Sequence, residues 1–75
     1  MRPLYEIALE IKKDWRKCSP YAKDHLDAME HLSSIDDKYY ADSARTIVSY
    51  FLSNASSWKG DVARRVKTEL KEMLK

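Results

Sequence analysis

Apolar residues recur every three or four positions along four stretches of the chain, which is the spacing of one face of an α-helix. The four apolar stripes are Leu4, Ile7, Ala8, Ile11 and Trp15; Tyr21, Ala22, Leu26, Met29 and Leu32; Ala44, Ile47, Val48, Phe51, Leu52 and Ala55; and Val62, Ala63, Val66, Leu70, Met73 and Leu74. This pattern predicts helices over roughly residues 3–17, 20–33, 43–54 and 60–74.

Residues that start helices stand where the stripes begin. Pro3 suits a first helical turn, and Ser19 followed by Pro20 is typical of an N-cap and the first helical position. Asp42 or Ser43 is placed to cap the third helix. With one glycine and two prolines, the chain has few of the residues that tight β-turns use. No stretch alternates apolar and polar residues for long enough to make a strand, so we expect an all-α fold with no sheet.

Four amphipathic helices joined by short links can shield their apolar stripes only by packing against one another. At 75 residues the chain has room for one domain. We therefore expect residues 1–75 to form a single helical domain, a compact small bundle with one core. The long polar connection over residues 33–40 predicts a less regular arrangement than an up-down bundle.

Composition also bears on the cellular location of the protein. The lone Cys18 excludes a disulfide within the chain and fits a reducing cytoplasm. No apolar run approaches the ~20 residues that a membrane span needs, and the N-terminus has no signal-peptide pattern. We expect a cytoplasmic protein that has no contact with a membrane.

Charge is unevenly distributed along the chain. Residues 1–18 hold five basic and three acidic side chains, residues 19–42 hold two and six, and residues 43–75 hold seven and three. The overall charge of +2 therefore hides an acidic middle between basic ends. Either the ends neutralise the middle within the fold, or one sign forms a docking surface that steers a partner.

The basic residues of the last stripe suggest nucleic acid as a partner. Several of them recur at three and four positions and share one helix face, which is suited to neutralising phosphates. Glu69 and Glu72 interleave with them, however, and no known DNA-binding motif accompanies them. The nucleic-acid-binding candidates are Arg64, Arg65, Lys67, Lys71 and Lys75.

The acidic middle suggests a protein partner. Asp24, Asp27 and Glu30 recur at intervals of three and, with Asp36 and Asp37, are able to form a negative strip that resembles a phosphate backbone. The simpler interpretation is that Asp24 complements the positive N-terminus of the helix and that the other carboxylates are solvated. Two consecutive tyrosines follow in the polar connection, and exposed tyrosines are enriched at binding hot spots. Five other aromatic residues lie on or beside the stripes and are assigned to the core by default; they are Tyr5, Trp15, Tyr21, Phe51 and Trp58. The protein-binding candidates are Asp24, Asp27, Glu30, Asp36, Asp37, Tyr39 and Tyr40.

Catalytic and metal-binding chemistry has little support. His25 and His31 are six residues apart, so on a helix they face different directions and cannot share a metal. Asp36 and Asp37 lack the glycine and the closing glutamate of a calcium loop. Cys18 has no histidine near it in sequence to activate it. We therefore expect no enzyme activity, no cofactor, no metal and no small-molecule substrate.

A resemblance adds biological context. It is carried by the segments Leu4–Ala8, Asp14–Trp15, Asp42–Ala44, Ile47–Ala55, Trp58–Gly60 and Ala63–Lys67. In these segments the chain resembles a group of small uncharacterised all-helical proteins of bacteriophages and bacterial mobile elements. The resemblance spans nearly the whole chain and implies an accessory protein that binds and modulates a host protein, with anti-defence inhibitors among the examples of that role.

Together these observations favour a small, non-enzymatic protein-interaction module. The alternative is a nucleic-acid-binding regulator that uses the basic C-terminal helix. Salt distinguishes the two, because phosphate binding weakens log-linearly as salt rises.

Overall fold

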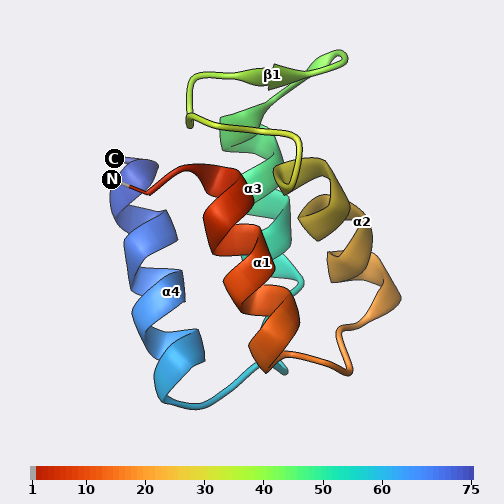
Figure 1. The fold of residues 1–75 in the computed structure, drawn as a ribbon, viewed down its shortest axis with the longest axis vertical. Coiled ribbons are helices and arrows are strands. Elements are labelled where there is room, and N and C mark those ends of the chain that lie inside the picture. Colours follow the sequence, from red (N-terminus) through yellow and green to blue (C-terminus); the bar gives the residue numbers. More distant parts are fainter. Residues whose placement is uncertain (1) are drawn as a thin grey trace.

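A computed structural model describes residues 2–75 and contains four α-helices and one small hairpin (Figure 1). The elements in chain order are α1 (Leu4–Asp14), α2 (Pro20–Met29), β1 (Lys38–Tyr39), β2 (Asp42–Ser43), α3 (Ala44–Ser53) and α4 (Asp61–Met73). In Figure 1, α1 lies between α4 and α2, and α3 lies behind them. The prediction of a small, compact, mostly helical fold is confirmed.

The helices begin where their capping residues predict. The Ser19 hydroxyl accepts from the Ala22 N–H at 3.3 Å, with Pro20 at the first helical position. Ser43, rather than Asp42, caps α3, because its hydroxyl accepts from the Thr46 N–H at 3.2 Å. Local hydrogen bonding thus sets the start of both helices.

Two helices end earlier than the apolar stripes predicted. The α1 helix ends at Asp14 rather than at residue 17, because Trp15 leaves the helical conformation at φ −103° and ψ 76°. The α2 helix ends at Met29 rather than at residue 33, and turns carry the chain on to Leu32. In both cases the last residue of the stripe is buried without being helical, because a turn also brings its side chain to the core.

The prediction of no sheet is wrong. Strands β1 and β2 pair antiparallel, with Lys38 opposite Ser43 and Tyr39 opposite Asp42. Each strand has two residues, too few to show the alternation of apolar and polar residues that reveals a strand in sequence. The two-residue loop between them, Tyr40 and Ala41, contains no glycine, so the usual hairpin signal was missing as well.

A single core fills the space between the helices. Its largest fully buried side chains are Phe51, Leu4, Ile7, Ile11, Leu26, Met29, Leu32, Leu70, Val48 and Val66. At one end of this core the rings of Trp15 and Trp58 stack with centroids 5.8 Å apart, and Phe51 meets each of them edge-on at 6.3 Å. The indole N–H of Trp58 donates to the Asp14 carboxylate at 2.8 Å, which anchors the α3–α4 connection on the end of α1.

Both tyrosines that were assigned to the core lie on the surface instead. Tyr5 is 46% exposed and Tyr21 is 76% exposed, whereas Trp15, Phe51 and Trp58 are buried as predicted. A helix bundle of this size buries a narrow stripe of each helix, so a ring at the border of the stripe points outward.

Among residues 2–75, none of the helices has the length and apolar character that a membrane span requires.

Candidate functional site

Asp27 and Glu30 of the acidic candidate set join α2 to α1. The Lys12 ammonium lies 2.6 Å from the Asp27 carboxylate and 2.9 Å from that of Glu30, and Lys23 lies 3.3 Å from Asp27. The hydrogen bond from Lys12 holds the pKa of Asp27 below its usual value, and the same bond raises the pKa of Lys12. These two carboxylates are therefore paired within the fold and do not form a free negative strip.

Asp37 has a structural task in the loop that leads to the hairpin. Its carboxylate accepts from the backbone N–H groups of Ser33 at 2.9 Å and Ser34 at 3.0 Å, and these bonds lower the pKa of Asp37. Its backbone carbonyl accepts from the Ala44 N–H at 2.8 Å. Asp37 thus fastens both ends of the segment that carries the hairpin.

The carboxylates of the remaining two acidic candidates, Asp36 and Asp24, are exposed. Asp36 makes a loose ion pair with Arg45 at 3.5 Å, between two exposed side chains. Asp24 is exposed and makes no ion pair with any of residues 2–75. The structure therefore divides the acidic set instead of gathering it into one surface.

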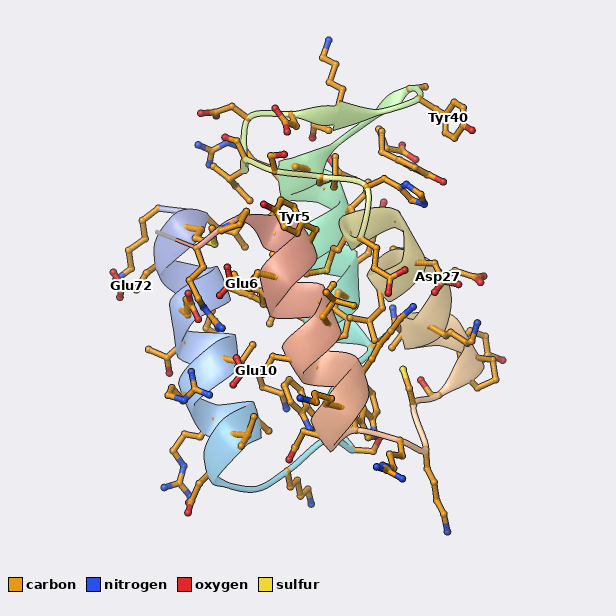
Figure 2. The ribbon with its side chains drawn as sticks, in the orientation of Figure 1. Tyr5, Glu6, Glu10, Asp27, Tyr40 and Glu72 are labelled. Carbon is orange, nitrogen blue, oxygen red and sulfur yellow. The ribbon has the colours of Figure 1, made fainter. Side chains whose placement is uncertain are left out.

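The hairpin brings three aromatic side chains together. Tyr39 is half-buried against the core, and its ring stacks on His31 at 5.6 Å and 22°. Tyr39 also meets the ring of Tyr40 edge-on, with centroids 4.7 Å apart. Tyr40 itself is 88% exposed and projects from the hairpin tip (Figure 2). The tyrosine pair is the part of the predicted protein-binding set that stays together on the surface.

Tyr40 has an unusual backbone conformation. Its φ is +57°, and no other non-glycine residue of the described chain has a positive φ. A positive φ at only the first residue of a two-residue loop is the pattern of a type II′ turn, whose first position is usually glycine. For a bulky side chain this left-handed conformation costs about 1–2 kcal/mol. The fold therefore holds a large exposed ring at a position better suited to glycine.

Residues of α1 extend this aromatic surface, and sequence reasoning missed them. Tyr5 and the 55% exposed Leu9 line an open depression of about 310 Å³ together with Glu30 and His31. The Tyr5 N–H donates to the Leu32 carbonyl at 2.9 Å, so α1 starts directly beside this loop. Because Tyr5 and Leu9 are four positions apart, they form a second apolar pair on α1, a signal that was visible in the sequence.

These contacts define one continuous surface, which we name the aromatic strip. It runs from α1 across the turn after α2 to the hairpin tip, and it consists of Leu9, Tyr5, His31, Tyr39 and Tyr40. Two further exposed tyrosines, Tyr21 and Tyr50, lie outside it, and Tyr50 contacts His25 with ring centroids 5.6 Å apart.

The basic candidate set is divided in the same way as the acidic one. Arg65 is ion-paired with Glu10, and Lys75 is paired with Glu72 at 3.1 Å. Lys67 donates to the backbone carbonyl of Trp58 at 2.7 Å. This leaves Arg64 and Lys71 as the exposed members that form no ion pair with any other described residue.

Arg65 belongs to a network of charges that fixes α4 beside α1. Arg2 bonds the Glu69 carboxylate through two nitrogens at 2.7 and 3.1 Å, and its guanidinium also lies 2.8 Å from the Glu10 carboxylate. The hydrogen bond from Arg65 and then that from Arg2 lower the pKa of Glu10. Glutamates of α1 and α4 thus take up part of the basic charge predicted for nucleic acid.

The geometry does not favour a metal site or a reactive thiol. Within residues 2–75 no group of three or more His, Cys, Asp or Glu side chains lies close enough together to hold a metal ion. Cys18 packs at the edge of the core, and burial raises the pKa of its thiol, which disfavours the reactive thiolate.

Comparison with known proteins adds no family to this description. No protein-family model, no curated protein and no solved structure matches the chain. The resemblance to proteins of bacteriophages and mobile elements therefore stays a prediction from the sequence.

Proposed function

We propose that this protein is a small, non-enzymatic binding module that docks on a protein partner through the aromatic strip. The observation that carries the proposal is the conformation of Tyr40, whose ring is 88% exposed although its φ of +57° favours glycine. An exposed ring buries little area, so it gives the fold little in return for the backbone strain. Strain retained at an exposed residue is typical of a functional position.

The strip has the composition of a binding hot spot. Tyrosine combines a large apolar face with a hydroxyl for hydrogen bonding and loses little side-chain entropy on binding. Tyr40 supplies the projecting ring, Tyr39 contacts it edge-on, and His31 stacks on Tyr39. The depression beside Tyr5 and Leu9 offers a concave region for a partner's apolar side chain.

The charges around the strip specify the chemistry of the partner. Exposed Glu6 is next to Tyr5 in sequence, and exposed Asp42 pairs in register with Tyr39. A complementary surface has an apolar pocket for a tyrosine ring bordered by lysine or arginine side chains. The resemblance to phage and mobile-element proteins points to a bacterial host protein as this partner, including one that acts in defence.

Exposed tyrosines elsewhere on the molecule allow a matched experiment. Tagged wild-type protein, a Tyr5→Ala/Tyr40→Ala variant and a Tyr21→Ala/Tyr50→Ala variant would each be incubated with lysate of the bacterial host. Both variants lose two exposed tyrosine rings, but only the first loses them from the aromatic strip. We expect a host protein that wild type and the Tyr21/Tyr50 variant retain and that the Tyr5/Tyr40 variant loses.

The bound protein would then be purified and its affinity for each variant measured. Loss of a hot-spot tyrosine costs about 2 kcal/mol or more, which is a reduction of about thirtyfold in affinity. Equal affinity for all three proteins, with circular dichroism showing that all are folded, would refute docking through the strip.

The second candidate function is a nucleic-acid-binding regulator. Fewer of the basic side chains predicted for this function are free to contact phosphates. Carboxylates pair Arg65 and Lys75, and Lys67 gives one hydrogen bond to the Trp58 carbonyl, so only two cations of the predicted set remain free of ion pairs and hydrogen bonds to described residues. Nucleic-acid binding through this set would weaken linearly in log affinity against log salt. A partner bound through the aromatic strip would show a much weaker dependence on salt.

A further inference from the structure

Cationic side chains gather around a depression at the opposite end of the molecule from the hairpin. The depression has a volume of about 280 Å³ and lies between the α3–α4 connection and the first turns of α4. Lys59, Arg64 and Lys67 line it, and no carboxylate of the described chain does. We name these three residues and the space between them the basic pocket. Figure 1 places the start of α4 and the hairpin at opposite ends of the long axis.

The walls of the basic pocket are held in place by the core. Trp58, which is 2% exposed, forms one wall, and its ring is fixed by stacking on Trp15. Lys67 is oriented by its 2.7 Å bond to the Trp58 carbonyl, and its ammonium lies 5.8 Å from the centroid of the Trp58 ring. A cation anchored in this way needs little further ordering when it meets a ligand.

The cations of the pocket lack the neutralising partners found elsewhere on the protein. Carboxylates pair Arg2, Lys12 and Arg65, whereas Lys59 and Arg64 have no ion pair with any residue from 2 to 75. Burial, followed by the nearby charges of Lys71 and Lys59, lowers the pKa of Lys67. Like charges have thus been brought together at a concave site, where an anion would relieve their repulsion.

We propose that the basic pocket binds a phosphate group, held by Lys59, Arg64 and Lys67. Arginine forms paired hydrogen bonds with phosphate oxygens, and lysine contributes a compact positive charge. Phosphate fits better than a carboxylate ligand because three cations that line one depression match a group with more than one negative charge. This site is distinct from the aromatic strip, and it adds Lys59, which the sequence did not single out, to Arg64 and Lys67 of the predicted basic set.

The single glycine of the chain provides a direct reporter. Gly60 lines the pocket, and its amide signal is unambiguous in a ¹⁵N-correlated NMR spectrum because no other glycine is present. The full chain would be titrated with sodium pyrophosphate at constant ionic strength. We expect saturable shifts of the Gly60, Ala63 and Arg64 amides, with the hairpin amides unchanged.

Charge-matched variants separate the pocket from the overall positive charge. Arg64→Gln and Lys59→Gln each remove one cation from the pocket and should weaken pyrophosphate binding about tenfold. Lys38→Gln removes one exposed cation from the hairpin and should change the affinity less than twofold. Equal weakening by Lys38→Gln and Arg64→Gln would overturn the proposal, because it would show nonspecific attraction.

A second probe identifies the source of the phosphate. A short oligothymidylate that binds more tightly than pyrophosphate, shifts the same amides and depends on Arg64 would identify a nucleic-acid backbone. Tighter binding of pyrophosphate would identify a small phosphate compound. Saturation of the Gly60 shift by neither probe would refute the pocket as a phosphate site. Tyr40→Ala should leave both titrations unchanged, so this result is independent of docking through the aromatic strip.

Discussion

Replacing Tyr40 by alanine and by glycine tests whether its backbone is strained. Alanine removes the ring but keeps a Cβ at φ +57°, whereas glycine also removes the steric conflict. The conflict is worth about 1–2 kcal/mol, and the greater freedom of glycine in the unfolded chain offsets about 0.4–1 kcal/mol of that gain. We therefore expect the glycine variant to be more stable than the alanine variant by about 1 kcal/mol.

The neighbouring loop residue provides the control. Ala41 is exposed like Tyr40, but it has no positive φ, so glycine brings no steric relief there. Ala41→Gly should destabilise the protein by about 0.4–1 kcal/mol. At position 40, in contrast, the glycine variant should be more stable than the alanine variant. The opposite signs at adjacent positions would isolate the backbone effect from general loosening of the loop.

Urea denaturation followed by tryptophan fluorescence would measure these differences. Trp15 and Trp58 stack within the core and lie far from the hairpin in sequence, so their emission reports global unfolding. Tyr40→Ala should itself change the free energy of unfolding by less than about 0.5 kcal/mol relative to wild type, because the ring is 88% exposed and loses only its edge-on contact with Tyr39. An alanine variant more stable than the glycine variant would refute the strain and remove the main support for a binding role of Tyr40.

Three further predictions concern the core, the turn before α4 and pH. Phe51→Ala should cost about 3–5 kcal/mol in urea denaturation, because the ring is fully buried at the centre of the tryptophan cluster; wild-type stability would show that the core is misplaced. Gly60 has a φ of +116° and a ψ of −179°, a backbone region that is essentially restricted to glycine, with open space where a Cβ would lie; Gly60→Ala should therefore lower the melting temperature in thermal melts, and an unchanged melting temperature would contradict a backbone cause. The pKa of Asp27 is lowered in the fold by the hydrogen bond from Lys12, so its contribution is complete above about pH 4 and is lost as pH falls through the folded pKa. Asp27→Asn should cost less than about 1 kcal/mol at pH 7, because both partners are partly exposed, and should flatten the loss of stability below about pH 4; an unchanged acid profile would contradict this ion pair.

The sequence alone determined the helices and their starting points. Ser19 and Ser43 cap helices through atoms within three residues of themselves, so the signal is entirely local. The apolar stripes likewise identify the core, because the faces with the densest apolar residues must meet in any compact arrangement. Phe51 and Val48 are fully buried for that reason, while Leu52 at the border of the same stripe is half-buried.

Helix ends and the hairpin depended on tertiary structure. Trp15 continues the apolar stripe of α1, but its backbone is no longer helical. Its ring stacks on Trp58, which comes from a distant part of the chain. The hairpin has no turn signal of its own, and the Asp37 loop and the start of α3 hold it in place through the Ala44 N–H bond. Neither feature can be read from a local window, because the stabilising partner lies outside it.

The functional surfaces depended most on tertiary structure. Composition along the chain showed an acidic middle and basic ends, but only the packing of α1 against α2 and α4 determined which charges neutralise each other. Lys12 occupies Asp27 and Glu30, and Glu10 occupies Arg65, so the residues that remain available are those without a neighbour of opposite charge on the adjacent helix. The same packing brings Tyr5 of α1 beside His31 and leaves the Tyr5 ring partly exposed. The exposure of a side chain depends on the assembled bundle and not on the residue's place in the sequence.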